Sequence, residues 1–187
     1  MVKKKACIFI SGNGTNLKSI IINSRDPNFP IKISLVLTNN KNAGGIHYAK
    51  KFLIPFRIIN FRKKKFERIA LKEMVEKKIK LICLAGFMKI LSKKFVRDFN
   101  GKIINIHPSL LPKYKGLNTF KRVLKNKERY TGCTVHVVDE KLDNGRVILK
   151  KRVEIYQGEE ENILKKRVQN EEHKLYSMAI RKVYNPL

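Results

Sequence analysis

The chain has 187 residues, of which 43% are apolar and 30% charged, and it carries a formal net charge of +27. This length and composition are those of a globular protein that can bury a sizeable core. They exclude a membrane-spanning protein, because no segment approaches the roughly 20 consecutive apolar residues that a spanning helix needs.

The excess of basic residues has two interpretations. A strongly basic surface can bind a polyanion such as RNA. The lysines are spread along the chain, however, and the densest runs, Lys63–Lys65 and Lys77–Lys78, flank a predicted helix. Neither an arginine-rich tail nor a platform of interleaved aromatic residues accompanies them. We therefore favour a solvated basic surface that attracts anionic substrates.

The N-terminus and the cysteines indicate a cytoplasmic protein. The apolar run Ala6–Ile10 follows a basic N-terminus, but it is too short for a signal peptide and leads into Ser11–Gly14, so we predict a buried first strand. Cys7, Cys83 and Cys133 are odd in number and lack C-x-x-C spacing. This argues against a disulfide framework and a zinc site, and we expect three small core residues.

Short β-branched runs alternate with amphipathic patterns up to Ile106. The predicted strands are Ala6–Ile10, Ile31–Leu37, Phe56–Ile59, Lys80–Ala85 and Ile103–Ile106. The predicted helices lie near Asn16–Ser24, Ile46–Phe52, Phe66–Lys78 and Lys93–Phe99. This alternation predicts an α/β fold with a single doubly wound, mostly parallel sheet that is covered on both faces.

The pattern changes after His107. Thr131–Val138 and Val147–Ile155 are predicted to form a β-hairpin joined through Asp139–Gly145, followed by a closing helix around Glu159–Val183. No linker, internal repeat or low-complexity segment is present, so we expect the whole chain to form one domain. Open α/β sheets bind ligands outside the carboxyl ends of their strands.

The first such strand end is a glycine-containing segment, Ser11-Gly12-Asn13-Gly14-Thr15-Asn16. It follows the first strand and opens a helix, so its backbone N–H groups and the helix N-terminus could bind a phosphate. A glycine turn in which Thr15 caps the helix would have the same sequence.

A second strand end combines an amide and an imidazole. The fifth strand runs into the proline-bounded turn Asn105-Ile106-His107-Pro108-Ser109-Leu110-Leu111-Pro112. Asn105 and His107 are two positions apart and share one face of the strand, so a donor and a base could address one substrate atom. A polar strand end with His107 bonded to the backbone is the alternative for an isolated match.

The whole turn resembles the signature Asn-x-His-x-Ser-Leu-Leu-Pro of the formyltransferases that use 10-formyltetrahydrofolate. The glycine segment resembles the loop with which glycinamide ribonucleotide (GAR) formyltransferases hold the phosphate of GAR. The resemblance thus implies GAR contacts for Gly12, Asn13, Gly14, Thr15 and Asn16.

The segment Leu84–Leu91 is similar to another motif of this family, Leu-Ala-Gly-Phe-Met-Arg-Ile-Leu. Its periodicity alone favours ordinary core. The resemblance instead implies a wall for the folate pteridine, with Lys89 keeping the charge but not the planar fork of the usual arginine. The residues implied in folate binding are Met88, Lys89, Ile90, Leu91, Asn105, Asp139 and Asp143.

Asp143 lies in the turn Asp139–Gly145 and matches the family motif Leu-Asp-x-Gly. A turn aspartate is usually only a local hydrogen-bond acceptor. The resemblance makes Asp143 the partner of His107, where it would favour the protonated imidazole and fix its orientation.

Two more positions match the family. Arg167–Tyr176 has the pattern of a solvated helix face, yet it resembles Arg-Val-Gln-x-x-Glu-His-x-x-Tyr, in which the glutamate, here Glu172, contacts the substrate ribose. His136 matches a family histidine, and we expect a structural or supporting role for it.

The resemblance runs from Ser11 to Tyr176. It implies direct transfer of the formyl group of 10-formyltetrahydrofolate to the amine of GAR in purine biosynthesis. Asn105, His107 and Asp143 would be catalytic, without a metal or a covalent acyl-enzyme. We expect small-molecule substrates, no specific nucleic acid, no membrane, and a monomer or homodimer.

Three alternatives remain at this level. Methionyl-tRNA formyltransferases share the signature but are expected to carry an additional C-terminal domain. Formyltetrahydrofolate deformylases are expected to carry an additional N-terminal domain. An RNA-binding module on a formyltransferase scaffold would explain the charge, and it would show steeply salt-dependent RNA binding without turnover.

Overall fold

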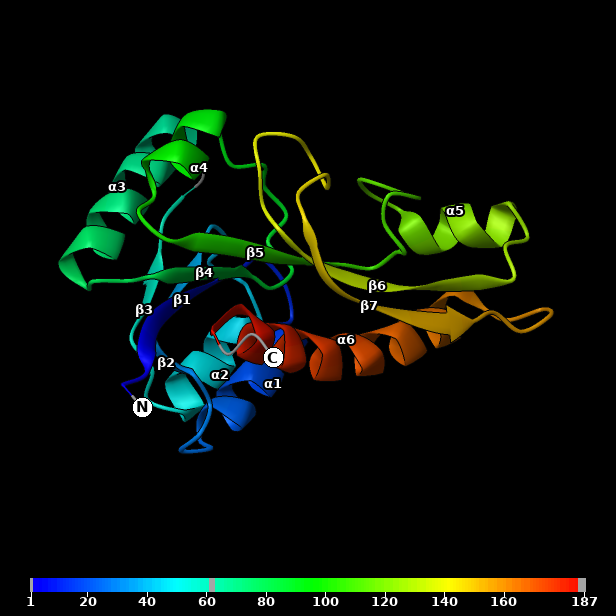
Figure 1. Ribbon diagram of the computed structural model, residues 1–187, viewed down its shortest axis with the longest axis horizontal. Coiled ribbons are helices and arrows are strands. Elements are labelled where there is room, and N and C mark those ends of the chain that lie inside the picture. The colour runs from blue at the N-terminus through cyan, green and yellow to red at the C-terminus, as the bar shows by residue number, and fades with distance from the viewer. Residues whose placement is uncertain (1, 61–62, 185–187) are drawn as a thin grey trace.

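A computed structural model describes residues 2–60 and 63–184, except for the side chains of residues 63 and 64. The basic run Lys63–Lys65 therefore lies partly outside the described side chains. One sheet of seven strands, in the order β3-β2-β1-β4-β5-β6-β7, organises the described chain (Figure 1).

The first five strands pair in parallel, and β6 and β7 add an antiparallel hairpin. The strands are β1 Lys4–Ile10, β2 Ile31–Thr38, β3 Phe56–Ile58, β4 Leu81–Leu84, β5 Lys102–His107, β6 Tyr130–Val137 and β7 Val147–Glu154. The helices are α1 Thr15–Ser24, α2 Gly45–Lys51, α3 Lys63–Glu76, α4 Lys93–Asp98, α5 Thr119–Lys125 and α6 Glu161–Tyr184. The strand order reverses between β1 and β4, where such sheets bind ligands.

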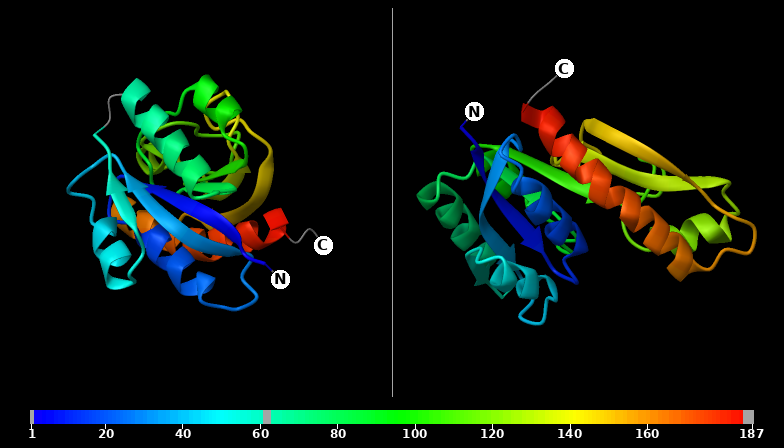
Figure 2. Two further views of the ribbon diagram at one scale, coloured as in Figure 1. Left: turned by 90° about the vertical axis from the view of Figure 1, so that its left-hand side faces the viewer. Right: turned by 90° about the horizontal axis from the view of Figure 1, so that it is seen from below.

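Strand β1 shows why the sheet needs helices on both faces. Ala6, Ile8 and Ile10 point into one hydrophobic cluster, whereas Cys7 and Phe9 point into the other. Because side chains alternate along a strand, a strand that is apolar at every position must be covered on both sides. Figure 2 shows α3 and α4 on one face of the sheet and α1, α2 and α6 on the other.

The predicted fold class is confirmed, including the hairpin and the closing helix, but the sequence pattern misses α5. This helix has seven residues, and its N-cap residue, Asn118, has φ 56° and makes no side-chain capping bond. A helix of about two turns leaves little periodicity to detect. Strand β5 also continues through His107.

None of the described helices has the length and apolar composition needed to cross a bilayer.

All three cysteines are free and buried, which confirms their assignment to the core. Burial raises the pKa of the Cys7 and Cys83 thiols well above the ordinary value and that of Cys133 to about 12. Such thiols are protonated at neutral pH and are unsuited to act as nucleophiles.

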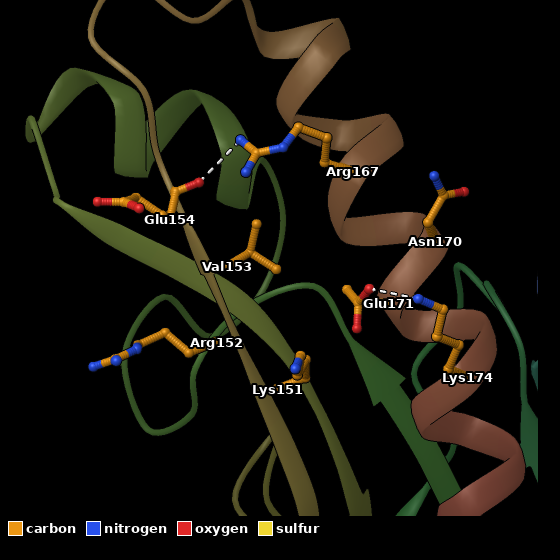
Figure 3. Close-up of a pocket in the computed structure, with 8 residues that line it drawn as sticks. All are labelled: Lys151, Arg152, Val153, Glu154, Arg167, Asn170, Glu171 and Lys174. Atoms are coloured by element: carbon orange, nitrogen blue, oxygen red, sulfur yellow. Dashed lines mark hydrogen bonds and ion pairs between the residues drawn. The ribbon is translucent and has the colours of Figure 1, made fainter.

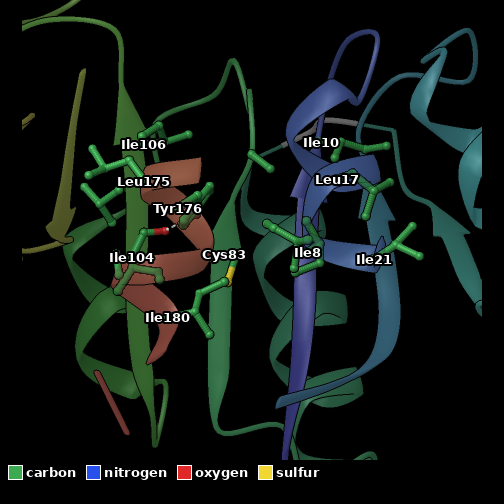
Figure 4. Packing of buried hydrophobic residues seen from close by; sticks show 14 of the residues in the cluster. Ile8, Ile10, Leu17, Ile21, Cys83, Ile104, Ile106, Leu175, Tyr176 and Ile180 are labelled. Atoms are coloured by element: carbon green, nitrogen blue, oxygen red, sulfur yellow. Dashed lines mark hydrogen bonds between the residues drawn. The ribbon is translucent and has the colours of Figure 1, made fainter. Parts of the chain in front are cut away.

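Tyr176 of α6 lies where β4 and β5 separate. The two strands are paired as far as Leu84 and Asn105. The buried Tyr176 hydroxyl lies 3.0 Å from the carbonyl oxygen of Leu84 and 3.1 Å from that of Ile104, so its proton is shared between two acceptors. Figure 4 shows Tyr176 beside Ile104. The hydroxyl thus satisfies buried carbonyls at the point where the strands diverge towards their carboxyl ends.

We expect Tyr176→Phe to lower the free energy of unfolding by about 1–3 kcal/mol, because two buried carbonyls lose a hydrogen-bond donor that they share. Urea denaturation measures this change. Tyr156→Phe is the matched control, since Tyr156 is 57% exposed, and we expect a change below about 0.5 kcal/mol. Equal stability of the Tyr176 variant and the wild type would contradict this account of the strand separation.

Candidate functional site

The predicted segments meet at the carboxyl ends of β1, β4 and β5. The backbone N–H of Ser11 donates to the carbonyl of Gly86 at 3.1 Å. The Ser11 hydroxyl donates to Asn39 Oδ1 at 2.6 Å and accepts the N–H of Met88 at 2.8 Å. One serine therefore holds the glycine segment beside the segment that follows β4.

Asn105 and His136 form a cross-strand pair. They lie directly opposite each other in the antiparallel pairing of β5 and β6. Asn105 Nδ2 lies 3.2 Å from His136 Nε2, and His136 Nδ1 lies 2.9 Å from the carbonyl oxygen of Val137. Burial lowers the pKa of His136, although the Val137 hydrogen bond and the Asp143 carboxylate act in the opposite direction. The ring is therefore neutral at physiological pH.

His107 lies between two oxygen acceptors. Its Nε2 is 2.9 Å from the carbonyl oxygen of Tyr114, and its Nδ1 is 3.4 Å from Asp143 Oδ2. A carbonyl can only accept, so Nε2 carries a proton, and a proton on Nδ1 would be attracted to the carboxylate. The Nδ1 contact is longer than an ordinary hydrogen bond, which leaves Nδ1 the freer of the two nitrogens to meet a substrate.

Hydrogen bonds from the backbone of the segment after β5 attach this segment to Thr134 of β6 and to Asp143. The Thr134 hydroxyl donates to the carbonyl of Ser109 at 2.6 Å and accepts the N–H of Leu111 at 3.1 Å. Further along, the N–H of Gly116 donates to Asp143 Oδ2 at 2.9 Å, and Lys115 Nζ donates to Asn144 Oδ1 at 2.7 Å. Asp143 is thus held by the same segment that contacts His107.

The glycine segment has the geometry of an anion cradle. Gly14 has φ +72°, and a Cβ there would lie 2.4 Å from Gly45 Cα, so only glycine fits. A Cβ on Gly12 would meet no atom within 4 Å. Among the described residues, none accepts a hydrogen bond from the N–H groups of Asn13, Gly14 or Thr15. These donors and the N-terminus of α1 form a suitable site for a phosphate.

The alternative in which Thr15 caps α1 is wrong. Gly14 occupies the N-cap position in the left-handed conformation, and Thr15 is the first residue of the helix. The Thr15 hydroxyl instead accepts a hydrogen bond from Gln169 Nε2 at 2.8 Å. The side chain therefore joins α1 to α6 rather than capping its own helix.

Glu172 brings a buried carboxylate to the same end of α1. Its Oε2 accepts a hydrogen bond from Asn16 Nδ2 at 2.9 Å, and the Asn16 Oδ1 atom is buried without a partner. Burial raises the pKa of Glu172, and the Asn16 hydrogen bond only partly opposes this. An unsatisfied acceptor beside a poorly solvated carboxylate is the expected arrangement where a ligand with hydroxyl groups completes the network.

The residues after β4 that are predicted to contact folate differ in their solvent exposure. Met88 and Ile90 are 66% and 62% exposed and are not core. Lys89 is also exposed, whereas Leu91 is partly buried. Exposed apolar side chains beside a polar cluster are suited to a flat heterocycle.

Asp139 has a local role in addition to any ligand contact. Its Oδ1 accepts the N–H of Lys141 at 2.9 Å, which forms a turn at the start of the 139–145 segment. Asp143 follows in this segment with φ +48° and is 8% exposed. The segment therefore holds the Asp143 carboxylate buried against the two histidines.

Sequence reasoning missed several contributors to the site. The backbone groups of Tyr114 and Gly116 contact the His107–Asp143 pair, and the side chains of Ser11 and Gln169 position the glycine segment. Backbone contacts leave no signature in residue type. For Ser11 and Gln169 the signal was their place inside the matched motifs.

A groove between β7 and α6 is not part of this cluster (Figure 3). It is lined by Lys151, Arg152, Val153, Glu154, Arg167, Asn170, Glu171 and Lys174. Arg167 donates to the carbonyl of Glu154 and Lys174 pairs with Glu171. Its charges are therefore partly engaged within the protein. No group of three or more possible metal ligands occurs among the side chains that the structure describes.

The chain matches the formyl transferase family model over residues 4–180. The protein therefore belongs to the formyl transferase family.

The chain is also similar to individual members of this family. It is 38% identical to the phosphoribosylglycinamide formyltransferase of Haemophilus influenzae, covering 95% of this chain and 86% of that one. It is 41% identical to the human trifunctional purine biosynthetic protein adenosine-3, of which it spans only 18%. The crystal structure of the Brucella melitensis phosphoribosylglycinamide formyltransferase superimposes with a TM-score of 0.92 at 35% identity, covering 100% of this chain and 98% of that one.

We expect Glu172→Gln to stabilise the protein relative to the wild type at about pH 8, and the difference to shrink as the pH falls towards the ordinary glutamate pKa. Because the folded pKa is raised, the wild type loses stability as the pH rises through the interval between the unfolded and folded values. Urea denaturation across this range measures the difference. Glu171→Gln, which removes a partner of Lys174, is the control. A stability difference between Glu172→Gln and the wild type that is independent of pH would contradict a raised pKa for Glu172.

Proposed function

We propose that this protein transfers the formyl group of 10-formyltetrahydrofolate to the amine of phosphoribosylglycinamide (GAR), with Asn105, His107 and Asp143 as its catalytic residues. The observation that carries the proposal is the cluster at the end of β5. There, Asn105 and His107 lie next to a buried carboxylate, at the same edge of the sheet as the anion cradle after β1 and the exposed apolar segment after β4. Family membership and the named relatives support the same reaction.

The reaction needs stabilisation of an oxyanion. The GAR amine attacks the formyl carbon as the free base, and the carbonyl oxygen becomes negative as the new C–N bond forms. Asn105 Nδ2–H and His107 Nδ1–H are suited to donate to that oxygen, and the carboxylate of Asp143 stabilises the charged imidazole. Collapse of the intermediate breaks the bond to the folate nitrogen.

Protons balance within the site. The attacking amine loses one proton, and the departing folate nitrogen gains one, so no net proton is taken up. We assign the transfer of this proton to a water molecule, and Asp143 Oδ1 is the group that accepts it. This oxygen lies 3.7 Å from His136 Nε2. Holding both reactants at one edge of the sheet supplies much of the rate gain, because the transfer becomes effectively intramolecular.

Two flanking regions would bind the substrates. The N–H groups of the Gly12–Asn16 segment suit the GAR phosphate, and Glu172 with Asn16 suits the ribose hydroxyls. The exposed side chains of Met88 and Ile90 suit the folate heterocycle, together with Lys89, Leu91 and Asp139.

The direct test mixes the purified protein with GAR and a 10-formyl folate and follows release of the deformylated folate spectroscopically. Release that depends on both GAR and His107, with formyl-GAR identified by mass spectrometry, is the expected result. Release without GAR would indicate a deformylase instead. Absence of turnover together with steeply salt-dependent RNA binding would indicate the RNA-binding alternative.

Asp143→Asn should lower kcat by about 10²–10⁴-fold while changing the KM for GAR much less. The amide can still accept the Gly116 N–H, but it no longer favours a charged His107 or accepts a proton. Steady-state kinetics with GAR varied measures both constants. Glu140→Gln removes an exposed charge from the same turn and should leave both constants unchanged. A comparable loss in both variants would remove Asp143 from the mechanism.

Gly12→Ala should raise the KM for GAR about tenfold and leave kcat within about twofold. The added methyl group meets no protein atom, so the fold is unaffected, but it enters the space that a phosphate would occupy. Turnover at saturating GAR should return to the wild-type value. A lower kcat at saturation, or no change in KM, would contradict a phosphate site at this glycine.

A further inference from the structure

His136 accepts a hydrogen bond from Asn105, although histidine nitrogens can both donate and accept. The Val137 carbonyl oxygen, 2.9 Å from His136 Nδ1, can only accept, so Nδ1 carries a proton. His136 is 2% exposed, and its burial lowers its pKa. The ring is therefore neutral, and Nε2 presents a lone pair.

That lone pair determines which way the Asn105 amide points. Nε2 lies 3.2 Å from the Asn105 amide nitrogen. If the amide were turned over, its oxygen would face the lone pair and be repelled. With the nitrogen towards His136, one N–H is donated to the ring and the other remains for a ligand at the end of β5.

We infer that His136 is the positioning residue for catalysis, because its Nδ1-protonated tautomer directs the Asn105 amide so that an N–H meets the reacting oxygen. This inference rests on the proposed function. His136 touches no reacting atom in it. Its effect is to prevent the amide oxygen, a second negative partial charge, from facing the developing oxyanion.

Other groups around His136 do not remove this constraint. Asp143 and Asp139 favour a charged ring and His107 disfavours it, but desolvation is the largest influence. Asp143 Oδ1 is 3.7 Å from Nε2, farther than a hydrogen bond. The nearest partner of the lone pair is the Asn105 amide.

Kinetics of two substitutions test the inference. His136→Leu removes the acceptor, and we expect kcat to fall about 10- to 100-fold while the KM for GAR stays within about twofold. His136→Gln can place an amide oxygen where Nε2 lies, and it should recover most of the lost turnover. Thermal denaturation checks that both variants are folded. Equal losses in both variants, or a KM increase equal to the kcat loss, would overturn the positioning role.

A double-mutant cycle separates this role from packing. In an Asn105→Ala background, His136→Leu should change kcat by less than about twofold, because no amide remains to be directed. Losses that multiply in the double variant would mean that His136 acts elsewhere, through Asp143 or through packing, and would overturn the inference.

A spectroscopic measurement does not depend on turnover. Nitrogen-15 correlation spectra of histidine-labelled protein should show His136 protonated at Nδ1 and bare at Nε2. The Asn105 side-chain amide protons should shift in His136→Leu. An Nε2-protonated ring would overturn the inference even if the enzyme is active. The expected spectrum in a protein that does not transfer formyl groups would instead contradict the proposed function alone.

Discussion

The antiparallel pairing of β5 with β6 is the constraint on which the site depends. It places Asn105 opposite His136 and His107 opposite Thr134. The first pair directs an amide, and the second brings a hydroxyl that holds the backbone after β5. A slip of one residue would turn each side chain to the other face of the sheet and abolish both arrangements. The register therefore determines the geometry of the candidate site as well as that of the sheet.

Helix α6 positions the residues on the other side of the candidate site. Gln169, Glu172 and Tyr176 follow one face of the helix at intervals of three and four residues. Gln169 contacts Thr15, Glu172 contacts Asn16, and Tyr176 contacts the carbonyls where β4 and β5 separate. One rigid helix therefore links the anion cradle to the strand ends. Its buried carboxylate is unfavourable for stability, which is common where a site is organised for binding.

The acidic side chains of the candidate site differ in burial from those at the surface. Few acidic side chains are buried, and two of them, Asp143 and Glu172, lie in the candidate site. Many other acidic residues form ion pairs with lysine or arginine at the surface, including Glu76, Asp98 and Glu128. The remaining cations produce the net charge of +27. A strongly positive surface attracts anionic small molecules and raises the rate at which they reach the protein.

The sequence by itself determined the alternation of strands and helices, the hairpin and the motifs at the strand ends, because hydrophobic periodicity and glycine placement are local properties. It did not reveal α5, which is too short to show a clear periodicity, or the backbone contacts of Tyr114 and Gly116. Nor did it reveal which atom of Asn105 meets His136. Only the tertiary structure decided these points, since they depend on strand register and on backbone groups that every residue carries.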